Sequence, residues 1–356
     1  MNNARPIPQA HAQVFATFAA VGGVLAIASA AASPARAQSP AEFYKGKTIE
    51  LVIGFSAGGA YDVYARMVAR HIVNHIPGKP NMVAKQLTGG GSRVAANLLY
   101  NVNTKDGLVI ATADQSLPLS QAFGDKTIKF DTTKFHYIGN PISDNNTMVA
   151  WHTTGVTHWE QAKEKPMSLG ATGPNTSAWY GQVMNAMLGT KFKMITGYPG
   201  GNDINMALEK GEADVRGSNS WSSWKGTRSH WLAEKKIHLL VQIGLAKDPD
   251  LPNVPLLMDL PTDADDKAAL RLLSAPTAIG RPLFAPPGVP ADRVKALRDA
   301  FDATMKDPAF IAEANTSKLD LQPISGEELQ KIVADIVSTP PHIVARLKSV
   351  LELDKQ

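Results

Sequence analysis

Short apolar runs alternate along the chain with stretches in which apolar residues recur every three or four positions. Runs of four to eight apolar residues indicate buried strands, and the longer spacing indicates amphipathic helices. This alternation predicts an α/β protein with mostly parallel sheets flanked by helices. The expected strands are 49–55, 82–86, 108–113, 137–139, 148–151, 167–171, 192–195, 214–217, 237–244 and 279–284, and the clearest helices are 61–75, 94–102, 178–188, 204–210, 291–305 and 327–336.

The first 37 residues have the pattern of an export signal. Arg5 lies in a short polar region, residues 14–32 are apolar and rich in Ala and Gly, and the small-x-small motif 35–37 follows. A membrane anchor is the alternative, but an anchor is richer in Leu and Ile and has no cleavage motif at its end. We therefore expect a signal peptide, cleaved near Ala37, and a mature chain in the periplasm.

The composition of the mature chain excludes several classes of protein. Cleavage removes Arg5 and Arg36 from 36 basic residues and leaves 34 against 32 acidic ones, so a nucleic-acid partner has no support. The chain has no cysteine, which excludes disulfides and thiolate metal sites. Cleavage of 37 residues from 356 leaves 319, more than one core usually holds, so we expect two lobes.

One structural device is repeated in the two halves. Segments 51–72 and 167–188 each read as an apolar strand, a glycine-bearing turn with a hydroxyl residue, and an amphipathic helix, and 197–215 contains a third such turn. Such turns follow the carboxyl ends of strands, where open α/β sheets bind ligands. Two lobes that present these turns to each other would form a cleft.

The first turn supports two hypotheses. Residues 54–58 (GFSAG) match the nucleophile elbow of serine hydrolases, with Ser56 as nucleophile and His230, His238 and His342 downstream. Against this, the turn follows the first strand of the mature chain, so no earlier strand carries a second oxyanion donor. The alternative is a cradle of backbone N–H groups at a helix start that holds an anion.

Asp62 follows this turn and can pair with Arg66 four residues later. An acid beside the turn disfavours phosphate, and the turn has no lysine of a P-loop. A carboxylate held by neutral N–H and O–H donors fits better.

Two further clusters have a structural and a functional interpretation. His71 and His75 lie one helical turn apart and could share a metal, but the motif lacks the glutamate of H-E-x-x-H, so a solvated pair is favoured. Trp221, Trp224 and Trp231 could stack on a ligand, and packing of a loop on the second lobe is the preferred alternative.

A series of motifs extends over nearly all of the mature chain. They are FSAGGAYD (55–62) followed by Ala65-Arg66, TGGGS (88–92), KDGLV (105–109), GATGPNTS (170–177), YPGG (198–201) and APPGVP (285–290). In order and spacing they resemble the motifs of the periplasmic solute-binding proteins of tripartite tricarboxylate transporters, also called Bug receptors. That family commonly has proline at the position of Ser56, so the resemblance implies a hydrogen-bond donor there at most.

The resemblance implies a two-lobed periplasmic-binding-protein (flytrap) fold. Lobe 1 would comprise 38–142 and 278–356, and lobe 2 would comprise 143–277. The protein would be a monomer without cofactor or catalytic activity that captures a small organic carboxylate and delivers it to the permease subunits of the transporter. A periplasmic ligand sensor and an exported hydrolase are the alternatives.

The ligand would lie between the first turn and the facing turns of lobe 2. The expected ligand-binding residues are Ser56, Ala57, Gly58, Gly59, Gly90, Ser92, Thr172, Gly173, Asn175, Thr176, Ser177, Tyr198, Gly200, Gly201 and Ser218. The chain departs from the family pattern at Trp179, Tyr180 and the WSSW segment, where the distal end of a ligand would lie. Aliphatic di- and tricarboxylates, aromatic carboxylates and neutral vitamins therefore all stay open as ligands.

Overall fold

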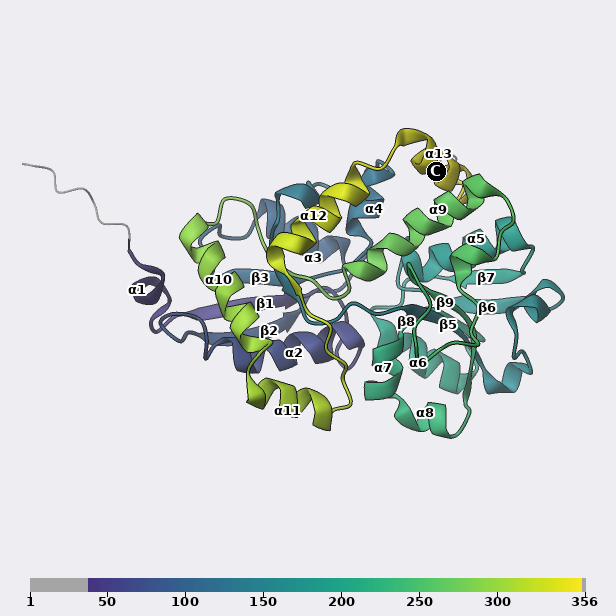
Figure 1. The fold of residues 1–356 in the computed structure, drawn as a ribbon, viewed down its shortest axis with the longest axis horizontal. Helices are drawn as coiled ribbons and strands as arrows, with labels where there is room; N and C mark the ends of the chain where they lie inside the picture. Colours follow the sequence, from purple (N-terminus) through teal and green to yellow (C-terminus); the bar gives the residue numbers. More distant parts are fainter. Residues whose placement is uncertain (1–37, 354–356) are drawn as a thin grey trace, which may run out of the picture. The chain divides into compact units, whose positions relative to one another are not determined.

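A computed structural model describes residues 38–353 of the protein (Figure 1). The predicted signal peptide and its cleavage near Ala37 lie outside the described residues. Among the helices that the structure describes, none is both long and apolar enough to cross a membrane. The strands form two sheets.

The first sheet has six strands in the order β11-β4-β10-β3-β1-β2. Its strands are β1 (Thr48–Ile53), β2 (Asn81–Gln86), β3 (Val109–Thr112), β4 (His136–Asn140), β10 (Leu283–Ala285) and β11 (Ile324–Ser325). Strand β1 pairs in parallel with β2 and β3, whereas β10 runs antiparallel to β3 and β4, and β11 antiparallel to β4.

The second sheet has five strands in the order β7-β6-β8-β5-β9. Its strands are β5 (Asn146–Trp151), β6 (Met167–Gly170), β7 (Phe192–Ile195), β8 (Val215–Ser220) and β9 (Ile237–Ile243). Strand β6 is parallel to β7 and β8, and β5 is antiparallel to β8 and β9.

The two-lobed α/β prediction is confirmed, but the sheets are mixed rather than mostly parallel. Strands β5 and β10 explain the difference. Each is the first strand after the chain has crossed from one sheet to the other, and each runs against both of its neighbours. The expected strand 279–284 is correct only in its last two residues, because Gly280 has a positive φ of 63° and Pro282 has no N–H for a ladder.

Helices cover both sheets. Around the first sheet lie α1 (Pro40–Tyr44), α2 (Ala60–Ile72), α3 (Arg93–Asn101), α4 (Leu117–Ala122), α10 (Ala291–Thr304), α11 (Pro308–Thr316) and α12 (Gly326–Val337). Around the second lie α5 (Thr176–Leu188), α6 (Gly201–Lys210), α7 (Trp221–Thr227), α8 (Ser229–Ala233) and α9 (Ala264–Ser274). The C-terminal helix α13 (Pro341–Val350) packs against α9 and α5, near the end of the chain in Figure 1. The lobe boundaries themselves stay a prediction.

The alternation of side chains along the strands divides the core. Val52 and Met148 belong to one cluster of buried side chains that extends over both sheets. Their neighbours Ile53 and Val149 point to the opposite faces and belong to two separate clusters, one for each sheet. The shared cluster ties the two sheets into one unit.

The parallel strands bring the predicted turns together. In the first sheet Ile53 is in register with Gln86 and Thr112, so the segments after β1, β2 and β3 leave at the same edge. In the second sheet Gly170 is in register with Ile195 and Arg216, so the segments after β6 and β7 leave together as well, beside the first residues of β8, which continues in the same direction to Ser220. The glycine-rich turns therefore lie at the carboxyl edges of the two sheets, as open α/β sheets require for a binding site.

Candidate functional site

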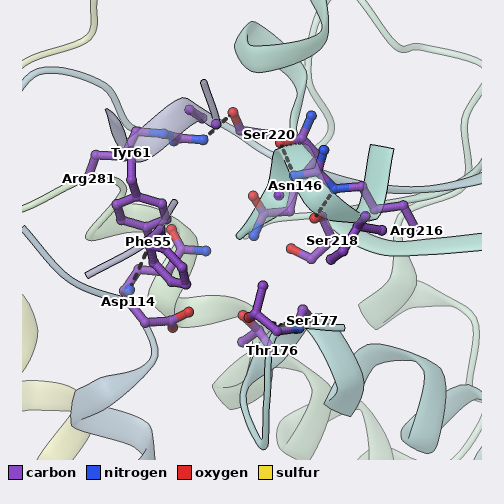
Figure 2. A pocket seen from close by; sticks show the side chains of 17 residues that line it. Phe55, Tyr61, Asp114, Asn146, Thr176, Ser177, Arg216, Ser218, Ser220 and Arg281 are labelled. Carbon is purple, nitrogen blue, oxygen red and sulfur yellow. Dashed lines mark hydrogen bonds between the residues drawn. The ribbon is translucent and has the colours of Figure 1, made fainter. Parts of the chain in front are cut away.

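A cavity of about 70 Å³ is lined by residues from these edges of both sheets (Figure 2). From the first sheet come Phe55, Tyr61 and Asp114, and from the second come Thr176 and Arg216, among others. Since both sheets contribute, the predicted position of the site between the two halves agrees with the structure.

The first turn shapes this cavity mainly through its aromatic side chains. The rings of Phe55 and Tyr61 lie 4.6 Å apart, centre to centre. The Tyr61 hydroxyl accepts a hydrogen bond from the Gln115 N–H (3.0 Å) and donates one to the Gly280 carbonyl (3.3 Å). Burial raises the pKa of Tyr61, so the hydroxyl stays neutral and forms a fixed wall.

Two backbone donors of the first turn are used within the protein. The Gly58 N–H donates to Asp62 Oδ2 (3.0 Å), and Asp62 Oδ1 accepts from Arg66 Nε (2.7 Å). The expected Asp62–Arg66 pair is thus confirmed. The Ser56 N–H donates to the Pro199 carbonyl across the cleft (3.3 Å). These two amides therefore already have acceptors within the protein.

The turn after β6 caps helix α5 with its own side chains. Asn175 is the N-cap, and its Oδ1 accepts from the N–H (3.0 Å) and the hydroxyl (2.5 Å) of Ser177. The Ser177 hydroxyl oxygen in turn accepts from the Thr172 N–H (3.0 Å). These bonds hold Thr172, Thr176 and Ser177 in the cavity wall.

Arg216 on β8 is buried in the cavity wall with neutral partners. Its Nε donates to the Ser218 carbonyl (3.2 Å), Nη1 to Asn205 Oδ1 (2.6 Å) and Nη2 to Asn219 Oδ1 (2.9 Å). The ring of Trp224 lies 5.0 Å from the guanidinium carbon. Three of the five N–H donors of the guanidinium are used in this way, and within residues 38–353 none meets a carboxylate.

The electrostatics of Arg216 favour an anionic guest. Burial, followed by the positive charges of Arg228 and Arg281, lowers the pKa of Arg216 to about 9. The guanidinium therefore keeps its charge at neutral pH. Its burial costs solvation free energy, and no acid among the described residues offsets that cost. A carboxylate bound in the cavity would supply the missing opposite charge.

Arg281 is a second guanidinium on the cavity, located where the chain returns to the first sheet. It pairs with Asp144 on the other crossing segment (Nη1 to Oδ1, 3.3 Å) and donates to the Ser220 hydroxyl. Its guanidinium carbon lies 5.6 and 5.5 Å from the ring centres of Tyr61 and Tyr64. This contact network links both crossings to the wall of the site.

Two donors on cavity-lining residues have no hydrogen-bond partner among the described residues. They are Asn219 Nδ2 and Arg281 Nε, and both atoms are buried. Buried polar atoms of folded proteins nearly always have a partner. Two unpartnered donors on residues that line one cavity point to a guest with acceptor oxygens.

Asp114, directly after β3, is an acid in the same wall. Its Oδ1 accepts from the N–H (2.8 Å) and the hydroxyl (2.5 Å) of Ser116, and Oδ2 accepts from Asn175 Nδ2 (2.8 Å). Burial raises its pKa, and the bonds from Ser116 oppose that rise.

The predicted site residues divide into two groups. Those that line the cavity are Gly59, Thr172, Thr176, Ser177, Gly201 and Ser218. Those that do not line it are Ser56, Ala57, Gly58, Gly90, Ser92, Gly173, Asn175, Tyr198 and Gly200. The second group lies beside the site and forms contacts within the protein. Ser92, for example, accepts a hydrogen bond at its hydroxyl from the Asp114 N–H (2.7 Å).

Sequence reasoning missed the three charged residues of the wall: Asp114, Arg216 and Arg281. Each of them interrupts an apolar strand pattern or directly ends one, which is a signal in the sequence. A search for glycine-rich turns does not detect that signal. The cavity wall therefore combines these charged residues with neutral donors that the sequence suggested. Trp179 and Tyr180, expected near the distal end of a ligand, are buried and do not line this cavity.

The tryptophan cluster packs within the protein. Trp224 and Trp231 are buried in the core cluster of the second sheet. Trp221 donates its ring N–H to Asp250 Oδ2 (3.0 Å). None of the three lines the cavity, so the packing interpretation is confirmed.

The histidine pair is neither a metal site nor solvated. His71 Nε2 lies 2.7 Å from Glu313 Oε2, and His75 Nε2 lies 2.9 Å from Asp307 Oδ2, so both rings contact α11. In the part of the chain that the structure describes, no group of three or more His, Cys, Asp or Glu side chains could hold a metal ion.

Comparisons with known proteins agree with the motif series. No protein-family model matches the chain. The chain is 25% identical to the UPF0065 protein in the gbd 5′ region of Cupriavidus necator over 344 residues, which cover 93% of this chain and 97% of that protein. The periplasmic binding protein BugD has a similar structure, with a TM-score of 0.70 and 18% identity over 86% of this chain and 98% of BugD.

MatC of Rhodopseudomonas palustris, determined with bound malate, is also similar, with a TM-score of 0.66 and 18% identity over 86% of this chain and 99% of MatC. The chain therefore has the two-lobed fold of periplasmic binding proteins, and its resemblance to the Bug (UPF0065) family, predicted from the glycine-rich turns, is confirmed.

Proposed function

We propose that this protein is an extracytoplasmic receptor that captures a small carboxylate in the cavity between its sheets and delivers it to a tripartite tricarboxylate-type transporter. It would act in the periplasm as a monomer and hand its guest to the permease subunits. The N-terminal signal pattern and the periplasmic proteins of the same fold support this location and role.

The observation that carries the proposal is the buried, charged Arg216, which has only neutral partners on the wall of the cavity. Keeping an unpaired charge away from water is costly, and a bound carboxylate would offset that cost. The unpartnered donors Asn219 Nδ2 and Arg281 Nε offer two further contacts for acceptor oxygens. MatC, which has this fold, was determined with a carboxylate, malate.

The size of the cavity indicates a small guest. Its volume is about 70 Å³. This favours short aliphatic carboxylates over aromatic ones.

The surroundings of Ser56 favour binding over hydrolysis. Its hydroxyl donates to Asp203 Oδ2 (2.5 Å), and none of the candidate bases His230, His238 and His342 is among its hydrogen-bond partners. A hydrolase would need such a base beside its nucleophile.

Calorimetry and thermal denaturation of the purified exported protein with a panel of aliphatic carboxylates test the proposal. A guest at ~100 times its dissociation constant should add ~2.7 kcal/mol of stability. Arg216→Gln should weaken binding of the best guest by ~10- to 150-fold, since a hydrogen bond to a charged group contributes about 1.5–3 kcal/mol.

Arg346→Gln is the matched control, because Arg346 pairs with Asp266 at the surface of the protein (2.6 Å). It should bind as the wild type does. If no carboxylate raises the melting temperature, or if Arg216→Gln folds and binds the best guest unchanged, the proposed function is wrong.

A further inference from the structure

The cavity carries charges of both signs. Asp114 and Arg216 both line it, and Figure 2 shows them on opposite sides of the open centre. They come from different sheets, since Asp114 follows β3 and Arg216 lies on β8. A guest in the cavity would thus lie between an acid and a guanidinium.

The other charged groups at the cavity compensate each other. Arg281 pairs with Asp144, and both side chains are only 6% exposed. Arg216 has no acidic partner, and Asp114 has no ion pair with a basic side chain among the described residues. Arg216 and Asp114 are therefore the two ionisable side chains of the wall that the protein leaves without an ionic partner.

Asp114 has room for one more donor. A carboxylate offers about four acceptor positions. Ser116 fills two of them and Asn175 fills one, all with neutral donors. Because the side chain is 8% exposed and faces the cavity, a guest is the remaining source of a partner.

We infer that the guest carries a hydrogen-bond donor, an amino or a hydroxyl group, in addition to its carboxylate, and that Asp114 selects for this donor while Arg216 holds the carboxylate. This inference rests on the proposed function and narrows its ligand class. A dicarboxylate would bring a second negative charge against Asp114, and a simple monocarboxylate would leave Asp114 without a partner. Small amino acids and hydroxy acids match both charged residues.

A series of acids that all have three carbons tests the proposed selection by Asp114. Propionate has no donor and malonate has a second carboxylate, whereas lactate, alanine and β-alanine each carry one donor. Butyrate, succinate, 3-hydroxybutyrate and 4-aminobutyrate repeat the comparison with four carbons. In calorimetry, the best donor-bearing acid of either series should bind at least about tenfold more tightly than the plain acid and the diacid, as expected for a hydrogen bond to a charged acceptor.

The chain offers a variant that removes the acid and keeps the local bonds. Asp114→Asn alone would place two amide NH₂ groups face to face, because Asn175 Nδ2 donates to Asp114 Oδ2. In the double variant Asp114→Asn with Asn175→Asp, the amide at 114 donates to the carboxylate at 175. Aspartate is as good an N-cap as asparagine, so α5 keeps its cap. Since residue 175 does not line the cavity, the carboxylate of the double variant lies behind the cavity wall.

The double variant should still bind carboxylates, and its preference for donor-bearing acids should fall from about tenfold or more to about onefold. If the wild type binds propionate or malonate as tightly as the donor-bearing acids, or if the double variant keeps the wild-type preference, the inference is wrong and the carboxylate receptor stands. If the wild type binds no carboxylate at all, the proposed function fails together with the inference.

Discussion

Gly200, which the sequence suggested as a ligand donor, instead lies against Ser56 on the opposite turn. A Cβ atom added at Gly200 would lie 2.9 Å from the Ser56 backbone nitrogen and 3.3 Å from its Cβ, and would also overlap its hydroxyl. Gly200 itself has extended backbone angles (φ −170°, ψ −179°), which any residue adopts. We therefore expect Gly200→Ala to fold normally and to oppose the approach of the two turns.

The structure gives the size of this effect. Normal contact of ~3.4 Å requires the turns to separate by about 0.5 Å, and such a shift takes the 3.3 Å bond from the Ser56 N–H to Pro199 beyond bonding distance. It also strains the bond from the Ser56 hydroxyl to Asp203 (2.5 Å). Losing the bond to the neutral Pro199 carbonyl costs ~1 kcal/mol, which corresponds to a ~5-fold weaker affinity if closure accompanies binding.

Calorimetry with the tightest-binding acid of the three- and four-carbon series measures this effect. Gly211→Ala is the control, because it should lower stability and leave the affinity unchanged. Gly211 ends α6 with φ 74°, and an added Cβ would meet nothing within 4 Å. The control should lose ~1 kcal/mol of unfolding free energy through strain and keep its affinity. A Gly200→Ala protein with wild-type affinity would refute the contribution of this contact to binding.

Two further predictions concern stability. Arg70, followed by His71, holds the pKa of Glu313 below its usual range, so this carboxylate stabilises the fold above pH ~4.3 and the contribution is lost as the pH falls below it. Glu313→Gln should lower the melting temperature at pH 7, and its difference from the wild type should shrink as the pH falls through the lowered pKa of Glu313; a difference that stays constant in acid would contradict this. Trp224→Phe removes the bond to the Thr147 hydroxyl (2.8 Å) inside the core and should cost ~2 kcal/mol in urea unfolding; an unchanged midpoint would contradict it.

The fold could be predicted from the sequence largely because its strands are continuous apolar runs. Strand β7 (Phe192–Ile195) was predicted with the observed bounds, and β2 and β6 within one residue. Helices α9 and α13 were not among the helices predicted from the sequence. Strand direction could not be predicted either, because the apolar pattern of a strand is the same whether it runs parallel or antiparallel to its neighbour.

The charged residues of the site were harder to predict for a physical reason. Arg216 interrupts an apolar strand, and a single charge there is as consistent with a surface position as with a buried one. Its burial depends on Asn205 and Asn219, which come from α6 and from farther along β8 and accept its hydrogen bonds. Only the tertiary structure shows that these partners are neutral and that no acid joins them.

The glycines of the turns matter more for the close packing of the two halves against each other than for contact with a guest. A Cβ at Gly173 would lie 3.0 Å from the Gly91 nitrogen, and a Cβ at Gly200 would lie 2.9 Å from the Ser56 nitrogen. Side chains at these positions would keep the turns apart, whereas glycine lets one backbone lie directly against the other. The motif that resembles an anion cradle therefore brings the two turns together, and under the proposed function the attraction for an anion comes from Arg216 on the strand behind it.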